Sequence, residues 1–396
     1  MNNNEFISDE QVVEVVKSGN IAVLEKVILC GYNINQYFFM DEHRGIDEDG
    51  YEIEYEAYFY SLLSIACESE NIEIVKILIK YGAKIYSETE RESEWEDFCE
   101  VKNPIICACK NGNVDILNFL VDNGANLDIR DRNGNTLVDI AIYNNNIDIL
   151  KYLVSKVKTV NLNLHAACNI GNTEIVKYLI EKGANINQRQ FKTHGQTPIE
   201  AAGNNLEIIR LLLSLGAKPS LFGIKYETCY CDGVWFTTDI DTKEILPAIK
   251  LLIDSGADVN EERKNDMGNY SPLTLAIYGY DYNAVKYLVE KGANYNIRLT
   301  RLGDTGDIDG SSDYQSTLSL AKERLSQEYY NSDEKENYEV NQLKQIVDYL
   351  KSLGAKDYCI DSWCYDNFAE DSVNASMDNP FDLPYDTSID AFFENI

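Results

Sequence analysis

The sequence predicts an all-α protein, a solenoid of about nine helix-turn-helix repeats. Two observations carry this prediction. Residues 162–187 contain two short amphipathic segments separated at Gly171, and the second segment ends at Gly183. The same pattern, with its closing glycine and alanine, recurs along almost the whole chain. One such repeat cannot bury its own apolar face, so the repeats must stack on one another.

The two segments of residues 162–187 have the spacing of packed helices. The apolar positions of the second segment follow the i, i+1, i+4, i+5 pattern of one buried helical face, at Ile175, Val176, Leu179 and Ile180. Ala166 and Ala167 in the first segment are small, so that two helices can approach closely. Gly183 stands just after the second helix, where a left-handed conformation costs glycine least.

The closing glycine-alanine pair recurs at Gly82, Gly124, Gly216, Gly256, Gly292 and Gly354. A further copy has Val157 in place of the glycine, and a degenerate first copy ends at Gly31. With their small residues and their glycine endings, these repeats resemble the ankyrin-repeat family. The resemblance implies helix pairs joined by short β-hairpin fingers. It also implies binding of other proteins through the finger tips and through the concave face that the inner helices line.

The net charge of −31 restricts the kinds of partner. It excludes nonspecific nucleic-acid binding, which requires clustered Lys and Arg, and it disfavours docking on an anionic membrane. The N-terminus has no basic region followed by an apolar run, and no stretch is long and apolar enough to span a membrane. We therefore expect a soluble, cytoplasmic, monomeric protein whose partner is another protein.

No pattern in the sequence indicates catalysis, a cofactor or a metal. The three histidines, His43, His165 and His194, fall in separate repeats, and no nucleophile motif or phosphate-binding loop is present. The ten cysteines lack zinc-site spacing and suit a reducing compartment. Asp47 to Glu56 resembles half of a calcium loop, but Gly45 stands at its first ligand position, so a solvated acidic loop is preferred. The resemblance to ankyrin repeats implies a structural role for His165 at its turn.

Two acidic insertions and an acidic tail interrupt or follow the repeats. We expect the repeat domain to span residues 1–356, with insertions near 37–58 and 87–101 and a divergent repeat near 221–258. The tail, residues 357–396, contains ten carboxylates and no Lys or Arg, interleaved with aromatic residues. This composition predicts disorder and is typical of segments that fold on a partner, although a tail that only solubilises the last repeat fits as well.

The resemblance to ankyrin repeats also yields candidate partner-binding residues in the fingers. These are Arg130, Arg132 and Asn133 before the fourth repeat, Arg189, Phe191, Lys192 and His194 before the sixth, and Arg263 and Lys264 before the eighth.

The leading functional prediction is a non-enzymatic protein-protein interaction module. The alternative is an acidic inhibitor or immunity-type protein that neutralises a basic enzyme, such as a nuclease toxin, by presenting carboxylates where that enzyme expects phosphate. A third hypothesis places the acidic tail along the finger row, where it would compete with a partner.

Overall fold

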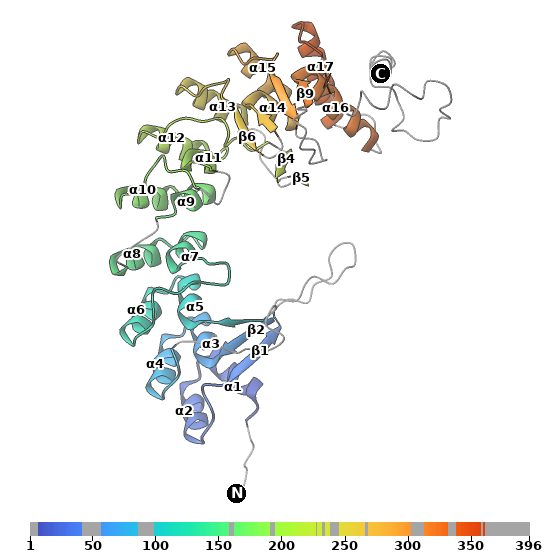
Figure 1. The fold of residues 1–396 in the computed structure, drawn as a ribbon. Coiled ribbons are helices and arrows are strands. Elements are labelled where there is room, and N and C mark those ends of the chain that lie inside the picture. The colour runs from blue at the N-terminus through green and yellow to red at the C-terminus, as the bar shows by residue number, and fades with distance from the viewer. Residues whose placement is uncertain are drawn as a thin grey trace, which may run out of the picture. The chain divides into compact units, whose positions relative to one another are not determined.

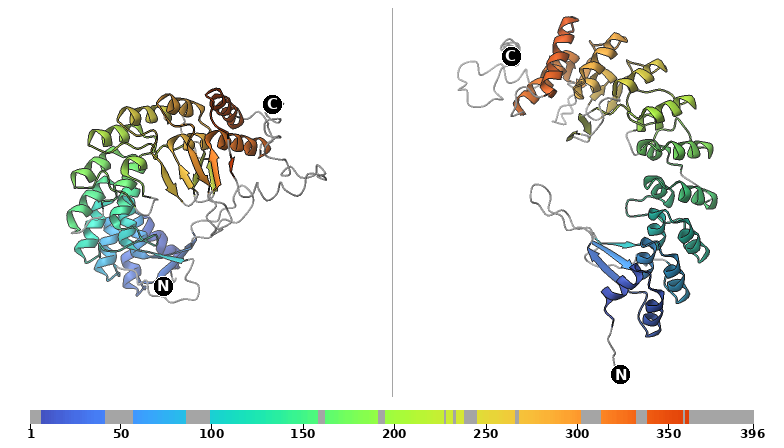
Figure 2. Two further views of the ribbon diagram at one scale, coloured as in Figure 1. Left: turned by 45° about the horizontal axis from the view of Figure 1, so that its top comes forward. Right: turned by 180° about the vertical axis from the view of Figure 1, so that it is seen from behind.

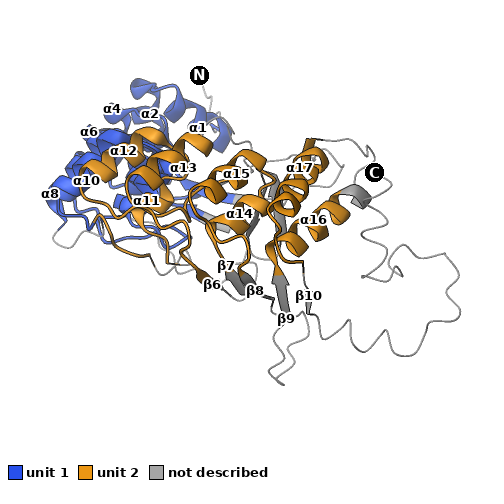
Figure 3. Cartoon of the chain, turned by 90° about the horizontal axis from the view of Figure 1, so that it is seen from above, with its two compact units in different colours: residues 1–185 blue, residues 186–396 orange. Residues whose placement is uncertain are grey.

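The computed structural model describes residues 7–41, 57–85, 99–157, 162–190, 195–226, 228–231, 234–237, 245–265, 268–301, 313–331, 338–357 and 359–360 (Figure 1). The chain divides into two compact halves, residues 1–185 and residues 186–396 (Figure 3). Most of the acidic insertions and nearly all of the tail lie outside the described residues, so the expected domain boundary at 356 stays a prediction.

The N-terminal half consists of stacked helix pairs. These are α1 Asp9–Lys17, α2 Ile21–Leu29, α3 Leu62–Glu68, α4 Ile72–Lys80, α5 Pro104–Asn111, α6 Val114–Asp122, α7 Leu137–Tyr143, α8 Ile147–Lys156, α9 Leu164–Ile170 and α10 Thr173–Glu181. The first helices of successive pairs pack in one row from α1 to α9, and the second helices pack in another row from α2 to α8. Figure 1 shows the two rows side by side. Each repeat thus buries its apolar face against its neighbours, as the sequence predicts.

Local sequence signals fix the helix ends. Ser8 caps α1 in a reciprocal capping box with Gln11. Five second helices begin after an asparagine whose side chain accepts from a backbone N–H of the first turn, at Asn20, Asn71, Asn113, Asn172 and Asn205. At the other end, Gly183 adopts a φ of 97°, in the left-handed region predicted for it.

The ends of both insertions form a three-stranded sheet in the N-terminal half. Its strands are β1 Tyr37–Asp41, β2 Ala57–Ser61 and β3 Cys99–Lys102. β1 pairs antiparallel with β2, and β2 pairs parallel with β3. Phe38 and Tyr60 of this sheet are buried, at 8% and 1% exposure. The strands, in blue and teal, project from the helices (Figure 2).

The C-terminal half contains both helices and strands. The helices are α11 Pro198–Ala201, α12 Leu206–Ser214, α13 Ile245–Asp254, α14 Pro272–Tyr278, α15 Tyr282–Glu290, α16 Thr317–Asn331 and α17 Tyr338–Ser352. The strands are β4 Thr228–Cys231, β5 Val234–Thr237, β6 Arg263–Asn265, β7 Gly268–Tyr270, β8 Arg298–Arg301, β9 Asp313–Ser316 and β10 Cys359–Ile360. β4 and β5 form a hairpin, and the other strands form one sheet in the order β10-β9-β8-β7-β6. The chain as a whole is mostly helical, with a few strands at its fingers.

A non-helical segment with a turn at residues 221–224, within residues 218–226, occupies the place of a first helix before α13. Leu221, Ile224 and Tyr226 in it are buried. Its Gly223 lies against the backbone of α11, because a Cβ at that residue would stand 2.4 Å from the Cα of Glu200. Among the residues described between α12 and α13 there is no helix. The sequence predicts a divergent repeat near residues 221–258, and the structure shows that residues 218–226 take the place of its first helix.

Asparagine clasps join successive repeats. In each clasp the side-chain amide of an asparagine four residues after the closing glycine bonds the turn of the next repeat. The amide of Asn35 donates to the carbonyl of Gly82 at 3.1 Å and accepts from the N–H of Lys84 at 2.8 Å. The corresponding asparagine bonds are Asn187 to Gly216 and Lys218, Asn260 to Gly292 and Asn294, and Asn296 to Lys356.

Candidate protein-binding surface

The finger at residues 126–136 is fixed from within by one carboxylate. Asp131 accepts from the backbone N–H groups of Asn133 and Asn135, at 3.0 and 2.8 Å, and from the Asn135 side-chain amide at 3.0 Å. The N–H of Gly134 donates to the carbonyl of Asp131 at 2.9 Å and closes the turn. Gly134 has a φ of 76°, whereas Asn133 is not among the residues with positive φ. Glycine alone therefore supplies the left-handed residue of this tip.

The hydrogen bonds to Asp131 leave part of the finger tip exposed. Arg132 and Asn133 lie at the exposed tip. Arg130 is exposed too, but its guanidinium folds back and donates to the carbonyl of Gly134 at 2.7 Å. The three predicted residues of this finger are thus brought together on one rigid turn.

The finger at residues 188–197 repeats part of this arrangement. Gln190 and Gln196 form an antiparallel bridge, and the exposed Arg189 donates to the carbonyl of Gly195 at 3.1 Å. Three predicted residues of this finger, Phe191, Lys192 and His194, lie outside the described residues. The backbone of Lys264 belongs to β6, but its side chain also lies outside them.

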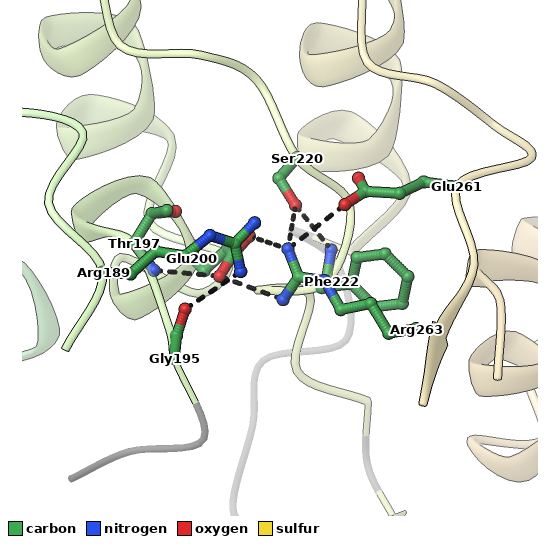
Figure 4. A network of polar contacts seen from close by, with 8 residues as sticks. All are labelled: Arg189, Gly195, Thr197, Glu200, Ser220, Phe222, Glu261 and Arg263. Atoms are coloured by element: carbon green, nitrogen blue, oxygen red, sulfur yellow. Dashed lines mark hydrogen bonds and ion pairs between the residues drawn. The ribbon is translucent and has the colours of Figure 1, made fainter. Parts of the chain in front are cut away.

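Arg263 has an internal role that the sequence analysis did not anticipate. Its guanidinium forms two hydrogen bonds with the carboxylate of Glu200 on α11, one of them at 3.2 Å (Figure 4). It also contacts Ser220 and Glu261, each at 3.4 Å, and lies 4.1 Å from the centre of the Phe222 ring. The Arg263 side chain is 14% exposed and that of Glu200 is 0% exposed. This arginine therefore holds the sixth repeat to the finger before the eighth.

The electrostatics of this pair favour the charged carboxylate. Burial by itself would raise the pKa of Glu200, but the hydrogen bond from Arg263, the backbone N–H of Thr197 and the hydroxyl of Ser220 outweigh it and lower that pKa. The Thr197 N–H donates to Glu200 at 2.9 Å. Arg189 lies beside the same network in Figure 4.

Arg263 stands one residue later in its finger than Arg130 and Arg189 stand in theirs, and its role differs from theirs. Arg130 and Arg189 each stand six residues after the closing glycine of the preceding repeat, whereas Arg263 stands seven residues after Gly256. In a strand, a shift of one residue moves a side chain to the opposite face. The sequence signal for the ion pair is Glu200, an acidic residue that follows the helix-opening pair Thr197-Pro198.

The remaining chemistry-bearing residues are part of the core. His165 on α9 is 9% exposed, and Cys67, Cys107, Cys109 and Cys168 are buried free thiols. Among the described residues, no group of three or more His, Cys, Asp or Glu could hold a metal ion. None of the helices in the described ranges is long and apolar enough to cross a membrane. The residues of the half calcium loop are not among those described.

Comparison with known families matches residues 63–163 and 161–222 to the ankyrin repeats (3 copies) family. The chain is 28% identical over 203 residues to alpha-latroinsectotoxin-Lt1a of Latrodectus tredecimguttatus, covering 47% of this chain and 14% of the toxin. It is 27% identical over 255 residues to an ankyrin repeat domain-containing protein of Stachybotrys chartarum, covering 63% of this chain and 12% of that protein.

A third relative is an ankyrin repeat protein of fowlpox virus, 30% identical over 183 residues, which are 43% of this chain and 50% of the viral protein. The chain thus spans half or less of the length of each of these relatives. Among solved structures, the ankyrin repeat domain of human ASB11 aligns with a TM-score of 0.38 and 21% identity, over 52% of this chain and 98% of that domain.

The stacked helix pairs and their fingers define a repeat protein of the solenoid class. The repeats matched within residues 63–222, together with the ankyrin-repeat relatives, support an ankyrin-repeat protein. Ankyrin repeats generally mediate protein-protein interactions, and the family is typically not enzymatic.

Proposed function

We propose that this chain is a non-enzymatic module that binds another protein through its finger tips and the concave face lined by its first helices. The observation that carries the proposal is the finger at residues 126–136. Backbone hydrogen bonds to the Asp131 carboxylate hold the turn in one conformation, in which Arg132 and Asn133 are exposed. A preorganised polar tip loses little conformational entropy when it binds. The proposal includes about nine repeats acting as a soluble, cytoplasmic monomer.

The experiment uses the full chain as bait in its native lysate and identifies the retained protein. The variant Arg132→Glu with Asn133→Ala should lower the affinity for that protein at least about tenfold, as expected for removal of two central contacts. Lys177→Glu is the matched control, because Lys177 is an exposed cation on the second helix α10. Equal loss in both variants, or no loss in either, would count against the finger surface.

A second candidate function is an acidic inhibitor of a basic enzyme, and one observation favours it. The sheet register places Asp41 opposite Ala57 and Ala57 opposite Cys99. The first insertion leaves β1 at Asp41 and returns at Ala57, and the second ends at Cys99. Both insertions therefore adjoin the same end of one sheet. Together, residues 41–56 and 88–100 contain 15 carboxylates and two arginines.

Salt dependence separates the two candidates. Raising the ionic strength from about 0.15 M to about 0.5 M shortens the Debye length to roughly half of 8 Å. An inhibitor that binds through the insertions should lose its basic partner at high salt, and replacement of the insertion carboxylates by amides should have the same effect. A partner retained at both salt concentrations supports the finger surface instead.

A further inference from the structure

Three successive first helices of the N-terminal half expose only their last residues. Every residue of α7 before Tyr143 is buried, and the same holds for α5 before Lys110 and for α9 before Asn169. The exposed ends are Lys110 and Asn111 on α5, Tyr143 on α7, and Asn169 and Ile170 on α9. Because α7 packs against both α5 and α9, the three ends form one row, with about 8–10 Å between neighbouring helices.

Two of these helix ends are apolar. Tyr143 is 51% exposed and Ile170 is 38% exposed. The other exposed large apolar side chains among the described residues all lie on or next to second helices, at Ile21, Leu29, Leu215 and Tyr338. Single exposed apolar residues are normal on a protein surface, whereas neighbouring ones form a patch of the kind found at protein-binding sites. Tyr143 and Ile170 together are called the helix-end patch.

Asparagines that precede the second helices hold the turns beside this patch. The side-chain amide of Asn146, before α8, donates to the carbonyl of Lys110 at 2.9 Å. The amide of Asn172, before α10, donates to the side-chain oxygen of Asn145. The turn of each repeat is thus bonded to the turn of its neighbour. A surface on a fixed backbone loses little conformational entropy when a partner binds.

The charge beside the helix-end patch is positive. Lys110 is the only charged residue among the exposed ends of α5, α7 and α9. None of the described residues forms an ion pair with it. The net charge of −31 does not cancel this local charge, because exposed charges beyond about 8 Å are largely screened at physiological ionic strength. The row is therefore complementary to an apolar group that stands close to a carboxylate.

We propose that the helix-end patch and Lys110 bind a partner segment in which an apolar side chain lies near an Asp or Glu. The apolar side chain packs on Tyr143 and Ile170, and the carboxylate meets the ammonium of Lys110. One helix spacing corresponds to about three residues of an extended segment. This rests on the proposed function and deepens it, because it specifies the chemistry of the partner. The sign of that partner is opposite to the basic enzyme of the second candidate function.

Selection from a random peptide library displayed on phage tests the patch on the full chain, with Tyr143→Ser plus Ile170→Ser as the counter-selected variant. Enriched peptides should carry Leu, Phe or Trp close to Asp or Glu, and the variant should bind them at least about tenfold more weakly. The matched control is Leu215→Ser with Tyr338→Ser, which removes an aliphatic and a tyrosine side chain of similar exposure, 47% and 58%. It should bind these peptides as the unaltered chain does. All four positions are exposed, so both variants should keep the far-UV circular dichroism spectrum.

A double-mutant cycle tests the role of Lys110. Replacement of the carboxylates of the selected peptides by amides should weaken binding to the unaltered chain about fivefold, as expected for one exposed ion pair. The same replacement should have no effect on binding to the Lys110→Gln variant, because the charge partner is already absent. An equal loss in both proteins would remove Lys110 from the site.

Four outcomes overturn the proposal. One is enrichment of basic peptides, and another is a set of peptides that bind the patch variant as well as the unaltered chain. A third is enrichment that appears only after deletion of residues 357–396, because the occupant would then be the tail of the chain itself. The fourth is a molecular mass that rises with protein concentration and no longer does so in the patch variant, because the occupant would then be a second copy. Peptides that depend on Arg132 and Asn133 but not on the patch would reject this inference and leave the finger surface in place.

Discussion

The carboxylate of Glu200 and the guanidinium of Arg263 form an ion pair between residues 63 positions apart, one on a first helix and the other on a finger strand. Between them the chain passes through the repeat in which the non-helical segment at residues 218–226 replaces the first helix. The pair therefore spans a place where the usual contact between first helices is missing. Because both charged groups are buried, removal of either one would leave the other charge without a partner in the protein interior.

Replacement of Glu200 by Gln should destabilise the protein by about 3–5 kcal/mol, because it leaves Arg263 buried without its charge partner. Urea unfolding followed by far-UV circular dichroism measures the change. Glu261→Gln is the control, since Glu261 also contacts Arg263 but is 33% exposed, and its loss should cost at most about 1 kcal/mol. Similar costs for the two variants would contradict the role assigned to the pair.

Gly223→Ala should cost about 1–3 kcal/mol through overpacking. The added Cβ would lie 2.4 Å from both the Cα and the carbonyl oxygen of Glu200, and backbone atoms cannot rotate away as a flexible side chain can. Thermal unfolding measures the accompanying fall in the melting temperature. The control is Ser255→Ala, at an exposed position after α13, which should change the melting temperature little. If Gly223→Ala left the melting temperature unchanged, residues 218–226 would be free to move away from α11.

Most of the repeat architecture could be predicted from the sequence, because the signals involved are local. A glycine that ends a helix and a capping pair such as Ser8 with Gln11 act within a few residues. The buried stripe of each helix is equally local. The strands at the insertion ends were not predicted, because β2 pairs with β3 across more than 35 residues.

The candidate site was predictable only in part. The resemblance to ankyrin repeats implies that Arg132 and Asn133 belong to a finger, where the structure finds both exposed. Partner binding by these two residues stays a prediction. The internal role of Arg263 depends on Glu200, Ser220 and Phe222. Two of these, Ser220 and Phe222, belong to the segment at residues 218–226, which is irregular rather than helical. No spacing rule in the sequence connects a carboxylate in one repeat with an arginine two repeats later.

Asn187→Ala should destabilise the C-terminal half by about 0.5–1.5 kcal/mol, the net worth of a typical hydrogen bond at an exposed site. The substitution leaves the N–H of Lys218 without its acceptor at 2.8 Å and the carbonyl of Gly216 without its donor at 3.4 Å. Amide exchange of Lys218 is the direct measurement and should become faster. Asn283→Ala on the exposed face of α15 is the matched control; if both variants were equally stable, the clasp would contribute nothing measurable.

Folding stability should fall as pH rises above about 9. Burial raises the pKa of Cys168 to about 12 from the ordinary 9.0, and it raises the pKa of Cys109 to about 12 despite the opposing charge of Lys110. Above pH 9 the unfolded thiols lose protons that the folded thiols keep, so each contributes a loss of about 1.4 kcal/mol per pH unit. Urea unfolding at pH 8 and at pH 10.5 checks the sign, and Cys168→Ala should make the dependence less steep.

The asparagine clasps also determine how the array carries a mechanical load. Where Asn35, Asn187 or Asn260 bonds the next turn, a pull along the chain is shared between two hydrogen bonds that act in parallel. Asp128 stands at the same place before the fourth repeat and has no amide to donate, and that repeat ends on Val157 rather than glycine. Successive repeats are therefore joined with unequal strength along the chain.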